Sequence, residues 1–386
     1  MKEALIGVAA ALPWVIAPIA TALRVRHSVS LASESVEAPA PAPLVTIVIP
    51  ARNEAGNIER CLNSVLTTTY PECEVVVVDD QSADGTGELA RAIALRDSRV
   101  RVIDNSHPPE GWFGKQWACN TGASAANGTI LCFADADTQH SPDLLTRSVN
   151  AIMRRNADLF SVMGRQELGS FWERIVQPHI FGIMAVRYGG TESVTKSPRT
   201  SDKIANGQCL FVQRLAYDEL GGHSLVKSHV ADDMMMAQRF FARGKHIVLE
   251  EGIEQLSTRM YTSFGELVHG WGKNVYAGGR DSVPMGRVGR FFFPLLLLLA
   301  PLWSVLPLVV LLISLVQPVA TVIYVWAVVV SMVSLVWWLD IYRRIGEPLW
   351  YAFLYPLGGA VIFYIFLRAV MRGQNVQWKG RDYVST

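Results

Sequence analysis

Hydrophobic residues are concentrated in four long runs, one at the start of the chain and three near its end. The runs span residues 4–23, 291–316, 319–339 and 348–367, and they contain almost no charged residues. About 20 apolar residues are needed for a helix to cross a bilayer, and each run reaches that length. The pattern therefore predicts four membrane-spanning helices, and a series of buried soluble helices is the alternative.

The N-terminal run has two interpretations. A cleaved signal peptide has a basic first segment and a short apolar core, whereas here Lys2 is followed by Glu3 and the run is long. Arg24 and Arg26 follow directly, and basic residues flank the cytoplasmic side of a membrane span. The sequence therefore predicts an anchor whose N-terminus lies outside.

A polar region between the runs contains short apolar stretches that are rich in β-branched residues. These stretches are residues 45–50, 74–79, 99–104 and 129–134. Continuous rather than alternating runs predict strands that are buried on both faces, as in a parallel sheet. Residues 57–68 and 86–95 carry apolar side chains at helical spacing. Alternating strands and helices predict a doubly wound α/β fold.

Polar clusters follow three of these predicted strands. They are residues 50–54, residues 79–86 and the pair Asp135 and Asp137. Ligands of such folds bind beyond the carboxyl ends of the strands, so all three clusters are expected at one edge of the sheet. Neither GxGxxG nor GxxxxGKS occurs at these turns, so the sequence has no dinucleotide fingerprint or P-loop there.

The pair Asp135 and Asp137 predicts a cation site. Residues two apart in an extended segment point the same way, although a turn can begin between them. Two close carboxylates repel each other unless a cation lies beside them, and their hard oxygen atoms suit Mg²⁺ or Mn²⁺. A turn-capping aspartate pair at the end of a strand is the alternative.

The other charged candidates have structural alternatives too. Asp79 and Asp80 can bind a nucleoside through its N–H or hydroxyl groups, or form an Asx turn. Asp232 and Asp233 begin a predicted helix, where the dipole alone favours acidic residues; Asp233 is also a candidate general base. Lys115 follows a Gly-containing turn and is either a phosphate-binding cation or a solvated lysine.

Composition adds little to this picture. The net charge of +1 gives no sign of a nucleic-acid partner. The five cysteines show no metal-binding or redox spacing, which is typical of a reducing compartment.

The motifs of the polar region, taken in order, resemble those of the family 2 glycosyltransferases, which have the GT-A fold. The similar stretches are VTIVIPARNE, VVVVDDQSADGT, GKQWACNTGA, FADAD, NGQCLFVQRLAYDELGG and VADDMMMAQRF. They cover about residues 44–274. GWFGKQWA, HGWGKNVYAGG and the terminal WKGRDY are similar to the membrane-bound subgroup that includes ceramide glucosyltransferases and the hopanoid- or carotenoid-associated enzymes.

The resemblance implies a fold and a set of roles. The fold would be a GT-A, Rossmann-like, mostly parallel α/β domain joined to transmembrane helices. Asp135 and Asp137 would hold Mg²⁺ or Mn²⁺ on the diphosphate of a nucleotide sugar, most simply a UDP-sugar. Asp233 would be the base that deprotonates the acceptor hydroxyl in a single inverting displacement. The remaining donor-binding candidates are Pro50, Arg52, Glu54, Asp79, Asp80, Lys115 and Asp135.

One departure from the family concerns the acceptor side. Processive polysaccharide synthases carry Gln/Arg-x-x-Arg-Trp after the base, whereas this chain reads LVHGW, with Gly270 in place of the arginine. The difference argues against a polysaccharide synthase. The acceptor-side candidates that remain are Gln208, Asp232, His269 and Trp271.

Composition and motifs together predict five regions. They are an anchor at 1–26, a Pro- and Ala-rich linker at 27–43, the GT-A domain at 44–283, a membrane region at 284–372 and a basic tail at 373–386. The catalytic domain is expected at the cytoplasmic face of a bacterial-type inner membrane. Three later spans would then put Arg368, Arg372, Lys379 and Arg381 outside, against the positive-inside rule. Either residues 348–367 are re-entrant or the WKGRDY tail returns to the active site.

The predicted function is therefore metal-dependent transfer of one sugar from a nucleotide sugar to a hydroxyl of a membrane lipid. A polyprenyl-phosphate glycosyl synthase, whose phosphate acceptor needs no base, is the first alternative. A transporter with a regulatory nucleotide-binding domain would carry charges inside its spans, which these runs lack. A non-catalytic binding protein would be expected to have lost one of the acidic clusters, and all are present.

Overall fold

The computed structural model describes residues 2–283, 286–373, 375–378 and 381–384, and its contacts divide the chain into two compact units. The sheet unit comprises Ser28–Glu167, Thr191–Met260 and Gln374–Thr386. The helical unit comprises Met1–His27, Leu168–Gly190 and Tyr261–Gly373. The five regions drawn from composition stay a prediction. Position 284, where the membrane region is expected to begin, and Lys379 lie outside the described residues.

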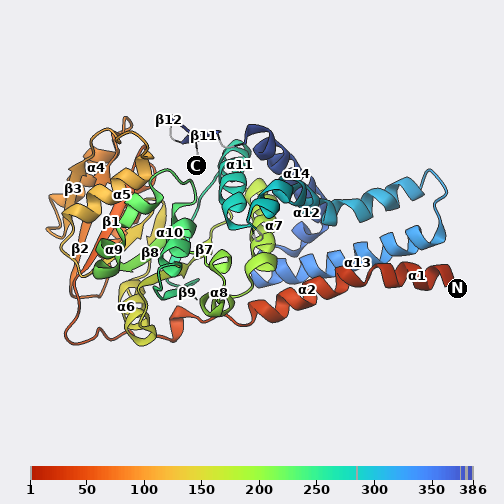
Figure 1. Ribbon diagram of the computed structural model, residues 1–386, viewed down its shortest axis with the longest axis horizontal. Helices are drawn as coiled ribbons and strands as arrows, with labels where there is room; N and C mark the ends of the chain where they lie inside the picture. Colours follow the sequence, from red (N-terminus) through yellow and green to blue (C-terminus); the bar gives the residue numbers. More distant parts are fainter. Residues whose placement is uncertain (1, 284–285, 374, 379–380, 385–386) are drawn as a thin grey trace. The chain divides into compact units, whose positions relative to one another are not determined.

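A seven-stranded sheet with the order β3-β2-β1-β4-β8-β6-β9 forms the centre of the sheet unit (Figure 1). Its strands are β1 (Val45–Ala51), β2 (Cys73–Asp79), β3 (Val100–Asp104), β4 (Ile130–Ala134), β6 (Leu159–Met163), β8 (Cys209–Gln213) and β9 (Ile247–Glu251). The strands β3, β2, β1 and β4 are parallel, and β8 is antiparallel to both of its neighbours. The predicted mostly parallel α/β sheet is therefore confirmed.

The neighbouring strands β1 and β2 are buried on both faces. Ile47 and Ile49 of β1 belong to one core cluster, whereas Val48 belongs to the other. Val77 and Val78 of β2 divide between the clusters in the same way. Successive side chains of a strand point to opposite faces, so a continuous apolar run is the pattern that such a strand requires.

Short helices and smaller β elements complete the sheet unit. The α-helices are α3 (Ile58–Leu66), α4 (Thr86–Ala94), α5 (Gly114–Ala125), α6 (Leu144–Arg155), α8 (Thr191–Lys196), α9 (Arg214–Leu220) and α10 (Asp232–Phe241). The 3-10 helices are η1 (Leu31–Ser33), η2 (Thr200–Asp202) and η3 (Gly222–Val226). A second sheet has the order β5 (Thr138–His140), β10 (Leu256–Thr258), β7 (Arg165–Gln166). β11 (Asn375–Trp378) and β12 (Arg381–Val384) pair antiparallel and form the terminal hairpin.

Helix α5 packs directly on β1 and β2 at Gly122. A Cβ atom at this glycine would lie 2.3 Å from Val48 Cγ1 in β1 and 3.0 Å from Val78 Cγ2 in β2. No side chain other than hydrogen fits such an approach without displacement. The helix that carries Lys115 is therefore held at a fixed height above the sheet.

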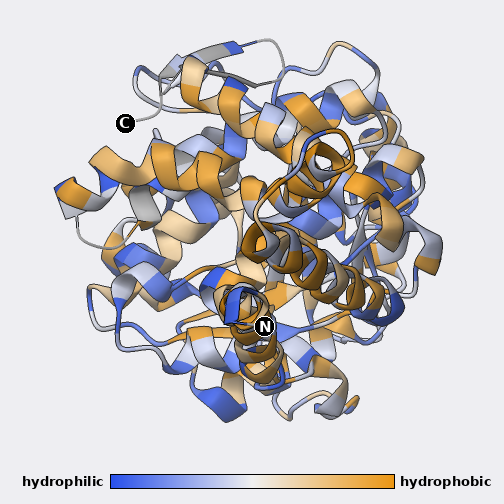
Figure 2. Cartoon of the chain, turned by 90° about the vertical axis from the view of Figure 1, so that its right-hand side faces the viewer, coloured by the Kyte–Doolittle hydropathy of each residue, from blue (hydrophilic) through white to orange (hydrophobic). Residues whose placement is uncertain are grey.

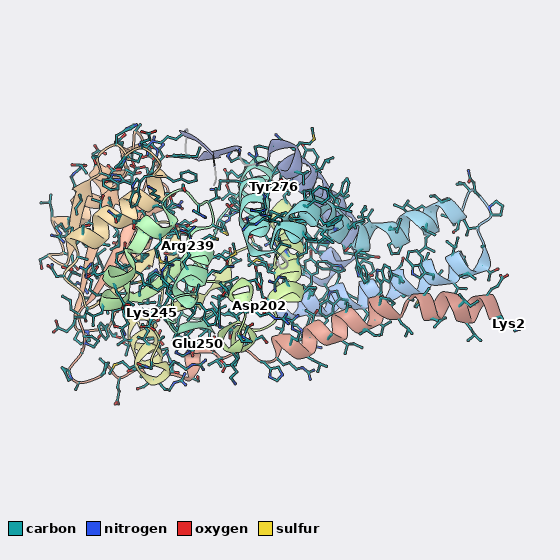
Figure 3. The ribbon with its side chains drawn as sticks, in the orientation of Figure 1. Lys2, Asp202, Arg239, Lys245, Glu250 and Tyr276 are labelled. Atoms are coloured by element: carbon teal, nitrogen blue, oxygen red, sulfur yellow. The ribbon has the colours of Figure 1, made fainter. Side chains whose placement is uncertain are left out.

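The segment predicted as a linker is fastened to the sheet unit. Leu31 is fully buried, and Arg147 of α6 donates hydrogen bonds to the carbonyl groups of Ala32 and Glu34. Arg154 of α6 forms ion pairs with Glu34 and with the buried Glu250 of β9, which Figure 3 labels. The composition is that of a linker, but the segment is part of the folded unit.

Among its described residues, the helical unit contains four helical stretches that are long and apolar enough to cross a membrane: Lys2–Val25, Gly286–Ser314, Thr321–Arg344 and Leu349–Arg372. The apolar residues along them are orange in Figure 2. The elements of this unit are α1 (Lys2–Ala10), α2 (Leu12–Val25), α7 (Phe171–Tyr188), α11 (Phe264–Ser282), α12 (Gly286–Ser314), α13 (Thr321–Arg344), η4 (Leu349–Leu354) and α14 (Tyr355–Arg372). These apolar helices indicate a membrane-associated protein.

The N-terminal helices pack against the C-terminal helices within this unit. A Cβ at Gly7 would lie 2.6 Å from the carbonyl oxygen of Val322 in α13. The ring of Trp14 stacks on Trp303 of α12 with centroids 3.8 Å apart, and its indole N–H donates to the Trp303 carbonyl at 3.2 Å. Segments from the two ends of the sequence thus form one helical assembly.

The close contact at Gly122 predicts a stability effect. Alanine normally favours a helix over glycine, but Gly122→Ala would overpack the α5–sheet contact, which costs about 1–3 kcal/mol. We expect a lower Tm for purified protein in detergent. The control is Gly182→Ala in α7, where an added Cβ meets no atom within 4 Å and the Tm is expected to hold or rise. An unchanged Tm for Gly122→Ala would contradict the packing described here.

Candidate functional site

The carboxyl ends of β1, β2 and β4 meet at one edge of the sheet. β1 lies between β2 and β4 and is parallel to both, with Ala51 in register with Asp79 and Val48 in register with Phe133. The three polar clusters that follow these strands therefore lie at the same edge, as predicted.

Asp79, the last residue of β2, is engaged in a turn. Its Oδ1 accepts a hydrogen bond from the backbone N–H of Ser82 at 3.1 Å. Its Oδ2 lies so close to Gly87 that a Cβ on this glycine would be 2.4 Å away. Asp79 thus fixes the loop between β2 and α4 through a bond to the backbone three residues on, a local structural role like that of the Asx turn considered as the alternative.

Asp80 is buried and surrounded by positive charge. Its side chain is 1% exposed, and its Oδ2 accepts a hydrogen bond from Arg381 of the terminal hairpin at 2.7 Å. Asn105, just after β3, donates to Oδ1 at 3.3 Å, and Arg52 Nη1 lies 3.9 Å from Oδ2. Burial raises the pKa of Asp80, and the charges of Arg381 and Arg52 oppose the rise.

Arg52 and Glu54 stabilise the loop that follows β1. Arg52 donates hydrogen bonds to the backbone carbonyl groups of Asp80 and Gln81 and so joins the β1 and β2 loops. The Glu54 carboxylate accepts from the Asn57 side chain at 2.9 Å. Both residues act on the loop itself in this structure.

The Asp135–Asp137 segment forms a turn. The backbone N–H of Thr138 bonds to the carbonyl of Asp135 at 3.3 Å, so the two carboxylates are not on one side of an extended strand. Asp137 Oδ1 is buried and has no hydrogen-bond partner among the described residues. Burial raises the pKa of Asp137 to about 7, and the charges of Asp135 and Glu54 add to the effect. An orphaned buried carboxylate oxygen beside other carboxylates fits a bound divalent cation.

Lys115 in the first turn of α5 supplies positive charge to this edge. Its Nζ lies 2.6 Å from Asp135 Oδ1. Burial opposes its charge, but Asp135 and Asp232 outweigh burial and hold the pKa of the ammonium group well above its ordinary value. Lys115 is therefore charged and is not a solvated surface lysine.

Asp232 and Asp233 lie in the first turn of α10. Asp233 Oδ2 accepts the N–H of Gly207 at 2.7 Å, and Oδ1 accepts the N–H of Met234 at 2.7 Å. Burial raises the pKa of Asp233, and it raises the pKa of Asp232 to about 6. A carboxylate with a raised pKa is a better proton acceptor than an ordinary one.

A pocket at this edge brings together predicted residues from several elements. Its walls include Pro50 near the end of β1, Lys115, Asp135, Asp232 and Asp233. Gly207 and His223 also line the pocket, and neither was predicted from the sequence as a site residue. The structure shows why residue 207 is a glycine, because a Cβ there would lie 3.0 Å from Asp233 Oδ2.

The acceptor-side candidates are distributed over both units. Gln208 in the sheet unit accepts hydrogen bonds from Gln166 and Asn206, each at 3.1 Å. His269 and Trp271 lie on α11 in the helical unit. Trp271 is 7% exposed and packs edge-on against Tyr261. Only Asp232 of the four candidates lines the pocket described above.

Comparison with known proteins shows which family and which enzymes the chain is similar to. Residues 46–220 match the model of Glycosyl transferase family 2. A 4,4'-diaponeurosporenoate glycosyltransferase of Staphylococcus haemolyticus is 27% identical over 266 residues, which are 68% of this chain and 66% of that protein. The enzyme of the same name from Staphylococcus aureus is 28% identical over 243 residues, which are 62% and 63%. The chain spans just under two thirds of the length of these curated relatives.

A solved structure has the same fold. It is a mannosyltransferase from Pyrobaculum calidifontis in complex with GDP-Man and Mn2+, with a TM-score of 0.59 and 20% identity. The match covers 96% of this chain and 98% of that one. Residues 46–220 thus form a domain that matches glycosyl transferase family 2, and the chain as a whole has the fold of that mannosyltransferase.

Proposed function

We propose that the protein transfers a single sugar from a nucleotide sugar to a hydroxyl group of a membrane lipid, with inversion at the anomeric carbon. One observation carries the proposal. Within a family 2 domain, a single pocket at the carboxyl ends of the strands holds Lys115, Asp135, Asp232 and Asp233. These residues provide the charges that a nucleotide-sugar donor and a proton-losing acceptor require.

The donor side would bind the diphosphate through cations. Asp135 and Asp137 would hold Mg²⁺ or Mn²⁺, which commonly binds one or two carboxylates together with substrate phosphates. The unpartnered Oδ1 of Asp137 supports this assignment. When bound, the cation neutralises the charge of the leaving diphosphate, and the mannosyltransferase of the same fold is in complex with Mn2+. Lys115 adds a permanent positive charge beside Asp135.

Asp233 would act on the acceptor. As the acceptor oxygen bonds to the anomeric carbon, the bond from that carbon to the nucleoside diphosphate breaks and the diphosphate leaves with the electron pair. The acceptor proton passes to the Asp233 carboxylate. The backbone N–H groups of Gly207 and Met234 orient this carboxylate, and its raised pKa favours proton transfer.

The acceptor would come from the membrane. Four helical stretches are long and apolar enough to cross a bilayer, and such anchoring keeps a catalytic domain close to a lipid at the bilayer surface. We place the catalytic domain at the cytoplasmic face of a bacterial-type inner membrane, where nucleotide sugars are available. The named relatives support a lipid-like acceptor, since their name specifies 4,4'-diaponeurosporenoate.

The same name supports a second candidate acceptor. By its ending it denotes the anion of an acid, and an acid acceptor is already ionised near neutral pH. Such an acceptor would need no base. The polyprenyl phosphate of the alternative prediction would not need one either. Dependence on Asp233 therefore distinguishes a hydroxyl acceptor from an anionic one.

One prediction of the proposed function concerns the donor and the metal. We expect the purified protein to release UDP from one UDP-sugar of a panel that also includes GDP-mannose. Release should increase with membrane lipid extract and Mn²⁺ and stop with EDTA, because the cation stabilises the leaving diphosphate by several kcal/mol. Asp137→Ala should reduce the rate at least about 100-fold. Asp218→Asn, at an exposed residue of α9, is the control.

Two results would contradict this prediction. If the folded protein released no nucleotide from any sugar of the panel, the proposed reaction would be contradicted. Equal rates with Mn²⁺ and with EDTA would remove the role of Asp135 and Asp137.

Another prediction of the proposed function concerns the base. Asp233→Asn should lower kcat by about 10²–10⁴-fold, the usual contribution of a general base, while the KM of the donor changes little. Single-turnover rates with the identified lipid would measure the loss, and Tm would show that the variant folds despite the altered bond to Gly207. Near-normal turnover would point to an acceptor that is already ionised.

A further inference from the structure

The terminal hairpin of β11 and β12 docks on the sheet unit at the edge where the polar loops gather. Arg381 Nη1 lies 2.7 Å from Asp80 Oδ2, and its Nη2 donates to Gln81 Oε1 at 3.0 Å. The Arg381 side chain is 14% exposed and that of Asp80 is 1% exposed. An ion pair this well buried joins residues that are 301 positions apart in the sequence.

A second contact attaches the hairpin to α5. The Tyr383 hydroxyl accepts a hydrogen bond from the backbone N–H of Gly114 at 3.2 Å. Its ring lies against Phe113 with centroids 4.2 Å apart. Gly114 precedes Lys115, the cation that pairs with Asp135. The hairpin thus contacts both the Asp80 loop and the start of the helix that carries Lys115.

We propose that the terminal hairpin is a permanent part of the donor site, in which Arg381 positions Asp80 and binds the nucleotide of the donor. This inference rests on the proposed function. The hairpin would complete the site by supplying a guanidinium group from a part of the chain outside the matched residues 46–220.

The chemistry of arginine favours this role. A guanidinium group has five N–H donors in a planar fork, and the described bonds of Arg381 go to Asp80 and Gln81. The donors that remain suit oxygen acceptors such as those of a nucleobase or a diphosphate. Gln81 has a positive φ of 59°, and the bond from Arg381 helps to hold this loop in the conformation that presents Asp80.

A displaceable plug is the competing interpretation, in which the donor would push Arg381 aside to reach Asp80. Breaking a buried ion pair is unfavourable, and only the longer contacts of Asp80 with Arg52 at 3.9 Å and Asn105 at 3.3 Å would then remain. The donor would also have to detach Tyr383 from Phe113 and Gly114. These linked contacts favour a hairpin that stays in place while the donor binds.

The test measures nucleotide binding without catalysis. Isothermal titration calorimetry of the full-length protein in detergent with Mn²⁺ would use UDP and GDP as probes. Arg381→Ala should weaken the Kd of the bound probe about tenfold or more, the effect of losing a charge-assisted hydrogen bond. Arg381→Lys should recover part of the loss. Arg99→Ala is the matched control, because Arg99 pairs with Asp97 just before β3, at the opposite end of that strand.

Activity provides an independent readout. In Arg381→Ala the KM of the donor should rise about tenfold while the KM of the lipid acceptor stays unchanged. A hairpin that only stabilises the fold would lower the Tm without this separation. Should Arg381→Ala fail to fold, Arg381→Lys and Tyr383→Phe carry the test, and each is expected to weaken binding of the probe.

Each remaining result overturns the inference. An unchanged Kd in a folded Arg381→Ala variant would make the hairpin purely structural, and a tighter Kd would make it a plug that competes with the nucleotide. If the wild-type protein bound neither UDP nor GDP, both the proposed function and this inference would be contradicted. Wild-type binding with no effect of Arg381 would remove the inference alone.

Discussion

Negative charge buried at one edge of a sheet is the constraint on which the site depends. Burial raises the pKa of Asp80, Asp137, Asp232 and Asp233. A buried carboxylate without a counter-charge is strongly destabilising. The fold must therefore bring positive charge or hydrogen-bond donors to each of these side chains. Arg381 and Arg52 lie beside Asp80, and the charge of Lys115 acts on Asp137, Asp232 and Asp233. Among the described residues, however, Asp137 Oδ1 has no hydrogen-bond partner.

The donors come from different parts of the sequence, and each depends on a separate piece of packing. Lys115 reaches Asp135 because α5 lies close on the sheet at Gly122. Asp233 is oriented by the backbone of Gly207, whose missing side chain allows the approach. Packing in the core thus determines the electrostatics at the edge.

The sequence predicted the parts of this arrangement that follow from local patterns. Continuous β-branched runs predicted the parallel strands β1 to β4. The polar residues at the ends of three of these strands predicted that the site lies at the edge of the sheet where those ends meet. Strands β6, β8 and β9 were not predicted. Nothing local in the sequence shows that β8 runs antiparallel to its neighbours β4 and β6. At Asp135 and Asp137 the sequence left open an extended segment or a turn, and the structure has the turn directly after β4.

Long-range pairs were beyond prediction from local patterns. Nothing near Arg381 in the sequence identifies Asp80 as its partner, although the resemblance of the WKGRDY segment raised a return of the tail to the active site as one option. Asn105 likewise reaches Asp80 from the neighbouring strand end. Such contacts depend on the order of the strands, which is a property of the whole sheet.

The Pro- and Ala-rich segment before β1 has a practical consequence. Stretches of this composition are usual places for insertions and for cleavage by proteases. Here Arg147 and Asn150 bind its backbone carbonyl groups, and Tyr70 binds that of Pro43 at 2.7 Å. Added residues would have to break these bonds and expose Leu31. A tag or an engineered cleavage site placed between residues 30 and 43 would therefore disturb the folded unit, where the same insertion in a free tether would be harmless.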